Sequence, residues 1–278
     1  MAVIRSLKDA IGVLSENTIL FAVGLMMAAL VLPQTLMSQI GVPVLPFFLT
    51  IATFFVSIFI LAGLYAMAYE GLHRGTTSLE TFKQMGKDRY LPLLGGTLIE
   101  VVIGFVFVFV ASMILVFTVG FAIASAFSGT GGEPELAALT GGGAIVGIAV
   151  AGVVLLIYAL FMFFVQFYRI AIVVDKSNVI EGYKKSAALV RHNFLYTIGY
   201  SLINLGIAFL ISLPIIVIGV APFALAYSSA GPSSIDLMTS SIVASLGITA
   251  YSFVIQIIMV PFRGTFAVSF YDRHKPGA

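Results

Sequence analysis

The chain has 278 residues, of which 60% are hydrophobic and only 9% are charged, and its formal net charge is +2. Soluble globular proteins carry about 25% charged residues, so this composition excludes an ordinary soluble domain and predicts an integral membrane protein. The absence of cysteine excludes thiolate chemistry and metal sites with cysteine ligands.

The amino-terminal stretch, residues 1–16, is predicted to form a helix that lies at the membrane surface. Its apolar side chains recur at helical spacing, with Arg5, Lys8 and Asp9 between them. Six apolar stretches follow, each long enough to cross a bilayer, which requires about 20 helical residues. They lie at about residues 18–40, 44–69, 90–127, 143–174, 193–227 and 237–270. We therefore expect an all-α, polytopic bundle of six transmembrane helices that forms a single domain over residues 1–278.

Two charged connectors, residues 70–89 and 175–192, separate the predicted hairpins. Each contains a capping-box pattern that predicts a helix start, Thr77-x-x-Glu80 in the first and Asn178-x-x-Glu181 in the second. Glu181 and Lys185 have the i,i+4 spacing of an ion pair. We interpret both connectors as amphipathic interfacial helices on the cytoplasmic side.

Basic residues lie on only one side of this predicted topology. All 14 Lys and Arg lie at the amino terminus, in the two charged connectors, near the matching ends of spans four and six, or in the carboxyl-terminal tail. The other three connectors carry only Glu133, Glu135 and Asp236 as charged residues. The positive-inside rule then predicts a multi-pass protein of the cell membrane with both termini in the cytoplasm.

The hairpins share features that allow two interpretations. A cap pattern precedes each one, with Ser6-x-x-Asp9 before the first, and each closes with an acid, namely Glu70, Asp175 or Asp272. Asn17 and Asn193 open the first and third hairpins. These features indicate either a threefold repeat of amphipathic helix and hairpin, or only the caps and flanking charges that any helix entering from the membrane surface needs. The registers agree only to about one helical turn.

The polar residues inside the spans form the first candidate site. Glu100 lies about ten residues into the third span, roughly 15 Å deep at about 1.5 Å per residue, where an unpaired ion costs several kcal/mol. One interpretation is a clasp between Glu100 and Arg263 or, as second choice, Arg169. The other is a polar site or pathway open to the cytoplasm. The complete set expected to converge on the bundle interior is Glu100, Arg169, Arg263, Gln166, Asn204 and Gln256.

The second candidate site is the basic helix with Lys184, Lys185 and Arg191, which either contacts acidic lipid headgroups or serves only as a topology anchor. Catalytic and metal-binding patterns are not found. The three histidines, His73, His192 and His274, lie in separate segments without ligand spacing, and the chain has no H-E-x-x-H, G-x-S-x-G or Walker motif. We expect no catalytic residue, no metal and no cofactor.

The segment AIVVDKSNVIEGYKKSAALVRHNFLYTIGYSLI, residues 171–203, resembles the signature of a known family. That family is the membrane domain fused to glycerophosphodiester phosphodiesterases, which also stands alone in uncharacterised archaeal relatives. The pieces SLKDAIGVLSENTILF, GTTSLETFKQMGKDRYLPLL and FAVSFYDRHK are similar to the stand-alone, halophile-type branch. The resemblance covers the entire chain and implies six spans, but it implies no activity and no binding residues. The phosphodiesterase domain of the fused relatives is absent, so enzymatic function cannot be inherited from them.

These observations favour a non-catalytic role, as a membrane scaffold or accessory subunit that binds a membrane partner or lipid. The alternative is a transporter-like protein for a small or lipidic solute that uses the inner-half polar site, and a lipid-acting membrane enzyme ranks third. The expected partners are the lipid bilayer and either a membrane protein or further copies of this chain, with no nucleic acid.

Overall fold

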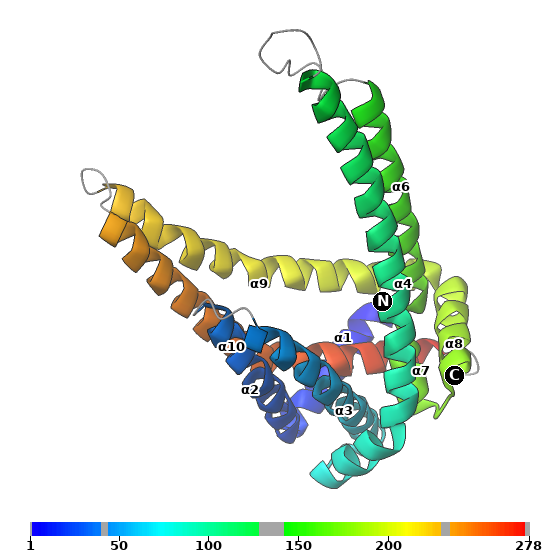
Figure 1. Ribbon diagram of the computed structural model, residues 1–278. Helices are drawn as coiled ribbons and strands as arrows, with labels where there is room; N and C mark the ends of the chain where they lie inside the picture. The colour runs from blue at the N-terminus through cyan, green and yellow to red at the C-terminus, as the bar shows by residue number, and fades with distance from the viewer. Residues whose placement is uncertain (1, 40–43, 128–141, 229–233, 276–278) are drawn as a thin grey trace. The chain divides into compact units, whose positions relative to one another are not determined.

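The computed structural model describes residues 2–39, 44–127, 142–228 and 234–275, and these residues form helices and no strand. The helices in chain order are α1 (Ala2–Glu16), α2 (Ile19–Gln39), α3 (Val44–Arg74), α4 (Leu79–Phe127), α6 (Gly142–Val165), α7 (Tyr168–Val174), α8 (Val179–His192), α9 (Phe194–Ser228) and α10 (Ser234–His274) (Figure 1).

Six candidate membrane spans occur among the described residues, which confirms the predicted all-α architecture. They are Ile19–Met37, Leu45–Arg74, Leu79–Thr118, Ile145–Val174, Phe194–Pro222 and Thr239–His274. The described residues form two compact units. The larger unit comprises Met1–Leu94 and Phe167–Ala278, and the smaller unit comprises Gly95–Gln166. The expectation of a single domain stays a prediction.

The expected fourth span is interrupted, because α6 ends at Val165 and α7 begins at Tyr168. The interruption has a local cause in the larger unit. The backbone N–H of Phe167 donates to the Ser186 hydroxyl of α8 at 3.0 Å, in place of a bond along its own helix. The short helix α7 is buried over most of its length, from Tyr168 to Val173.

The smaller unit is a hairpin in which α4 and α6 lie side by side (Figure 1). Phe107 and Tyr158 pack with their ring centroids 5.5 Å apart. A Cβ atom built on Gly147 would lie 2.2 Å from the Thr118 hydroxyl oxygen, so the absence of a side chain allows the two helices to approach. Most other large apolar side chains of this hairpin are exposed, as expected for helices that face lipid.

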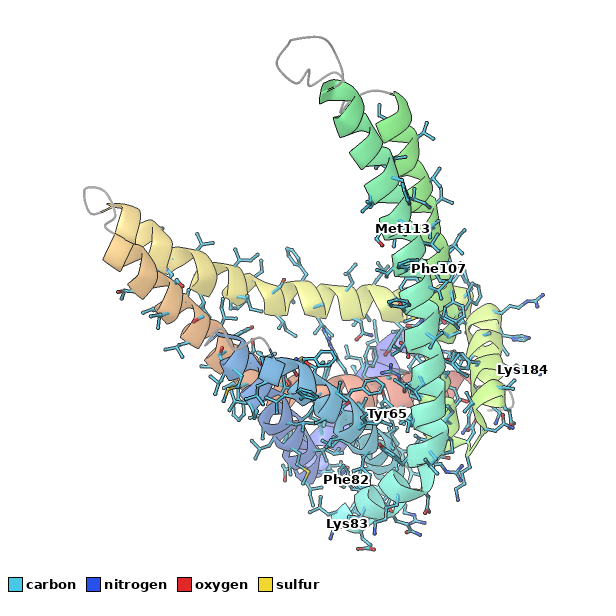
Figure 2. The ribbon with its side chains drawn as sticks, viewed as in Figure 1. Tyr65, Phe82, Lys83, Phe107, Met113 and Lys184 are labelled. Carbon is cyan, nitrogen blue, oxygen red and sulfur yellow. The ribbon has the colours of Figure 1, made fainter. Side chains whose placement is uncertain are left out.

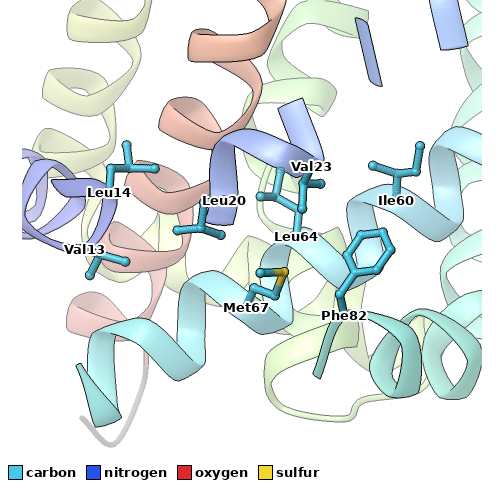
Figure 3. Close-up of a cluster of buried hydrophobic side chains, with 8 residues drawn as sticks. All are labelled: Val13, Leu14, Leu20, Val23, Ile60, Leu64, Met67 and Phe82. Carbon is cyan, nitrogen blue, oxygen red and sulfur yellow. The ribbon is translucent and has the colours of Figure 1, made fainter. Parts of the chain in front are cut away.

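The larger unit is built around α2, α3 and α10, which pack against one another, while α1 packs on α10. Figure 3 shows its hydrophobic core, to which α1, α2, α3 and the start of α4 contribute. The core side chains are Val13, Leu14, Leu20, Val23, Ile60, Leu64, Met67 and Phe82. Where α2 crosses α10, a Cβ atom on Gly24 would lie 2.2 Å from the Ile257 carbonyl oxygen, so only glycine permits this approach.

A second, aromatic cluster joins α7, α9 and α10 within the larger unit. Tyr200 packs against Phe266 and Phe270 at centroid distances of 4.8 and 4.7 Å. Phe167 stacks on Phe270 at 5.2 Å. These contacts hold the start of α7, the first part of α9 and the last part of α10 together.

Candidate functional site at the charged end of the larger unit

Three side chains occupy equivalent positions, each at the junction between an amphipathic segment and a span. The amide nitrogen of Asn17 donates to the Gly75 carbonyl at the end of α3, at 3.0 Å. The guanidinium of Arg89 donates to the Lys176 carbonyl after α7, at 3.2 Å, and the amide of Asn193 donates to the His274 carbonyl of α10, at 3.0 Å. Each residue therefore ties the end of the returning helix to the start of its own hairpin.

The equivalence extends to the residue eight positions before each junction, namely Asp9, Thr81 and Lys185. Asp9 pairs with Arg273 at the end of α10. Thr81 donates to Glu70 of α3 at 2.5 Å, and Lys185 pairs with Asp175 after α7 at 3.2 Å. Thr81 and Lys185 contact the charged end of the preceding returning helix, whereas Asp9, in the first repeat, contacts the charged end of α10, the last helix of the chain. A recurring three-dimensional contact favours the threefold repeat over flanking charges alone.

The cap patterns that suggested this repeat are only partly correct. Asn178 caps α8 as predicted, because its side-chain oxygen accepts from the Glu181 N–H at 2.9 Å. Ser78 takes the place expected for Thr77, since its hydroxyl accepts from the Thr81 N–H at 3.3 Å. Ser6 lies inside α1 and donates to the Ala2 carbonyl, so it is not a cap. The threefold repeat is therefore supported by the hydrogen bonds of the junction residues Asn17, Arg89 and Asn193 rather than by the cap patterns.

Two pockets occupy equivalent places in this repeat. The first, of about 510 Å³, lies among α1 and the ends of α3 and α10. The second, of about 200 Å³, lies among the start of α4 and the ends of α3 and α7. Both are lined by the residues eight and four positions before the junction, which are Asp9 and Val13 in the first pocket and Thr81 and Met85 in the second. Both also extend to the residue whose carbonyl is bound, Gly75 or Lys176.

The third equivalent place, among α8 and the ends of α7 and α10, contains a polar network. The Tyr271 hydroxyl donates to Asp175 at 2.6 Å, on the same carboxylate that Lys185 contacts. Lys275 pairs with Asp272 at 2.7 Å, and His73 approaches Asp272 at 3.4 Å. Burial by itself lowers the pKa of Lys275, but the hydrogen bond and charge of Asp272, aided by Tyr69 and Asp175, raise it above its usual value.

The three basic residues predicted to contact lipid divide into two groups. Lys185 is engaged by Asp175 and by Glu181 at 3.5 Å, which confirms the predicted i,i+4 pair. Lys184 and Arg191 are exposed, and neither makes an ion pair within the described part of the chain. Figure 2 shows Lys184 extending away from α8.

The predicted intramembrane polar residues fall in both units. Glu100 and Gln166 belong to the smaller unit, and Gln166, directly after α6, donates to the Phe163 carbonyl of that helix at 3.0 Å. Asn204 similarly donates to the Tyr200 carbonyl at 3.1 Å. Gln256 lines a small cavity of about 20 Å³ between α2 and α10. Pairing of Glu100 with an arginine stays a prediction.

The two candidate arginines belong to the larger unit. Arg169 is half-buried, and its Nε donates to the Tyr168 hydroxyl at 3.0 Å. Arg263 is exposed on α10. Within the described residues, no group of three His, Asp or Glu side chains could hold a metal ion.

Sequence reasoning did not identify Arg89 and Lys176 as parts of a site. The missed signal is the equal spacing in SLKDAIGVLSEN and SLETFKQMGKDR, which end on Asn17 and Arg89. Asn17 and Arg89 differ in size and charge, and the property that their side chains have in common is that both donate hydrogen bonds. Their equivalence is therefore visible in the hydrogen bonds of the structure and not in the residue types.

Comparison with known proteins identifies one family. The profile described as a domain of unknown function, DUF7847, matches residues 1–274. No curated protein and no solved structure matches the chain.

Proposed function

We propose that this chain, which belongs to the DUF7847 family, is a non-catalytic membrane scaffold or accessory subunit that binds lipid or a membrane-protein partner. The six long apolar helices are compatible with a multi-pass membrane protein. The one-sided placement of Lys and Arg supports a cell-membrane location with both termini in the cytoplasm. The segment 171–203 supports a relationship to the membrane domain of glycerophosphodiester phosphodiesterases.

The observation that carries the proposal is an exposed stripe on α8, formed by Ile180, Lys184 and Arg191. Ile180 is 67% exposed, and the two basic residues are exposed beside it. The intervals of four and eleven residues correspond to about one and three helical turns, so the three side chains share a face. Exposed basic side chains on one helix face attract an anionic membrane surface, and the exposed Ile180 adds an apolar contact on the same face.

The test compares the response of the purified protein to phosphatidylglycerol and to phosphatidylcholine. Each basic residue near an anionic surface contributes about 1 kcal/mol, so Lys184→Gln with Arg191→Gln should weaken phosphatidylglycerol binding by about 30-fold. The matched control, Lys184→Arg with Arg191→Lys, retains both charges and should bind as the wild type does. Equal phosphatidylglycerol binding by the neutral variant and the wild type would overturn the proposal.

A transporter-like function for a small or lipidic solute, which would use the polar residues inside the spans, is the alternative. The cavity beside Gln256, of about 20 Å³, has room for about one water molecule and does not by itself support it. Its lining also includes the hydroxyl side chains Thr35, Thr249 and Ser252. Stabilisation by a solute that Glu100→Gln abolishes would support transport. A lipid-acting enzyme is the third proposal, and lipid turnover by the purified protein would support it.

A further inference from the structure

The 200 Å³ pocket between the end of α3, the start of α4 and the end of α7 is defined here as the α3/α4/α7 pocket. One part of its wall is apolar, made by Ala66, Met85, Val173 and Val174. The other part is charged, made by Glu70, Arg74 and Lys176 together with His73. The pocket is smaller than the roughly 300–1,000 Å³ that encloses a drug-sized ligand. It therefore suits part of an amphipathic molecule, such as a headgroup whose tails remain outside.

The charges of this lining favour an anion. Glu70 is already satisfied by the protein, because it accepts from Arg74 at 2.9 Å, Thr77 at 3.0 Å and Thr81 at 2.5 Å. Arg74 offsets the charge of Glu70, and apart from His73 the lining has two basic residues, Arg74 and Lys176, against one acid, a net charge of +1. Lys176 supplies the excess, since it is exposed and makes no ion pair with any described residue.

Lys176 is also held in place more firmly than an ordinary surface lysine. Its φ of 54° lies in the left-handed region, which costs energy for a residue other than glycine. Its carbonyl accepts the hydrogen bond from Arg89 at 3.2 Å, which fixes the backbone. The equivalent residue of the first repeat is Gly75, with φ of 74°. A strained lysine where the first repeat has glycine points to a role for the ammonium group.

The depth of the pocket identifies the source of the anion. Two candidate spans end at its lining, Leu45–Arg74 and Ile145–Val174, and Leu79–Thr118 begins beside it. The pocket therefore lies where apolar helix ends and the polar headgroup region begins. The first pocket, although equivalent, carries Asp9, Glu16 and Asp272 and has the opposite charge balance. At the third place Lys185 and Tyr271 both contact Asp175.

We propose that the α3/α4/α7 pocket binds the phosphate headgroup of one anionic phospholipid, with Lys176 as the principal cation and the apolar wall against the start of the acyl chains. This inference deepens the lipid-binding function proposed above but uses none of the residues of the α8 stripe. The chemistry recognised is a phosphate oxyanion, and the apolar wall selects a lipid over free phosphate.

The experiment measures the number of bound phosphatidylglycerol molecules and their affinity by native mass spectrometry of the full chain in detergent. The wild type should retain one tightly bound lipid. Lys176→Gly removes the charge at a position whose φ suits glycine, so it should fold at least as stably as the wild type while binding this lipid about tenfold more weakly or worse. Lys176→Arg keeps the charge and should keep the bound lipid.

Two further arms separate the explanations. Inorganic phosphate at matched concentration should neither stabilise the protein nor displace the lipid, and equal stabilisation by phosphate would overturn the lipid assignment. The variant with Lys184→Gln and Arg191→Gln should retain the single tight lipid. If Lys176→Gly binds it as the wild type does, the pocket proposal fails, whatever the α8 variant shows. If Lys176→Gly loses the lipid while the variant with Lys184→Gln and Arg191→Gln binds phosphatidylglycerol as the wild type does, the pocket proposal is supported. The proposed lipid binding by the α8 stripe is then wrong.

Discussion

At the scale of single residues, the chain depends on a few side-chain amides that replace missing backbone partners. Asn17 is only 5% exposed and makes three hydrogen bonds, donating to the Val13 and Gly75 carbonyls and accepting from the Thr77 N–H at 2.9 Å. The last carbonyls of a helix have no partner within that helix. Asn17 therefore satisfies the end of α3 and the connector that follows it at the same time.

Asn17→Ala should lower the melting temperature in detergent, because it leaves the Gly75 carbonyl and the Thr77 N–H without their partner. Loss of a partner by a buried polar group costs about 1–3 kcal/mol. The control is Asn204→Ala, since the Asn204 amide donates to the Tyr200 carbonyl within its own helix. Thermal unfolding that is equally shifted in the two variants would contradict a special role for the junction residue.

At the scale of helices, the spans approach closely only where the side chain is small. Gly24 on α2 faces the backbone of α10 at Ile257, and backbone atoms cannot move aside as a flexible side chain can. Elsewhere a glycine has no such neighbour, because a Cβ atom on Gly206 of α9 would meet nothing within 4 Å. Two glycines in apolar helices therefore have different structural roles.

Gly24→Ala should destabilise the larger unit by about 1–3 kcal/mol, the usual cost of overpacking a closely packed contact. The matched variant Gly206→Ala should leave stability unchanged or raise it slightly, since alanine has the higher helix propensity. The measurement is the melting temperature of each variant in the same detergent. A harmless Gly24→Ala would show that α2 and α10 do not approach at this residue.

At the scale of the whole molecule, the orientation in the membrane follows from the basic residues, and the absence of cysteine makes it testable. Single cysteines replace Thr76 and Lys184, which are exposed in the two charged connectors, and Ser128 and Ser229, which lie in other connectors. An impermeant thiol reagent on intact cells should label Ser128→Cys and Ser229→Cys only.

Permeabilised cells provide the control for this experiment, because Thr76→Cys and Lys184→Cys should then react. Labelling of either of these two variants before permeabilisation would contradict a cytoplasmic location of the charged connectors. Protection of Ser128→Cys and Ser229→Cys in intact cells would contradict the external location of the other connectors.

The sequence by itself determined the helical class, the six spans and the confinement of Lys and Arg to certain segments, because hydropathy and charge act on each segment independently. It also predicted the Asn178 cap and the pair of Glu181 with Lys185, whose partners are close in the chain. These features need no knowledge of which helices are neighbours.

Only the tertiary structure decided which residues are equivalent in the three hairpins. The hydrogen bonds of Asn17, Arg89 and Asn193 join residues 58, 87 and 81 positions apart. Likewise, the interruption before α7 depends on Ser186, 19 positions beyond Phe167. Such contacts depend on how helices pack, and one side-chain donor can replace another of different type. For this reason Arg89 and Lys176 became parts of a candidate site only once the end of α3, the start of α4 and the end of α7 were placed together.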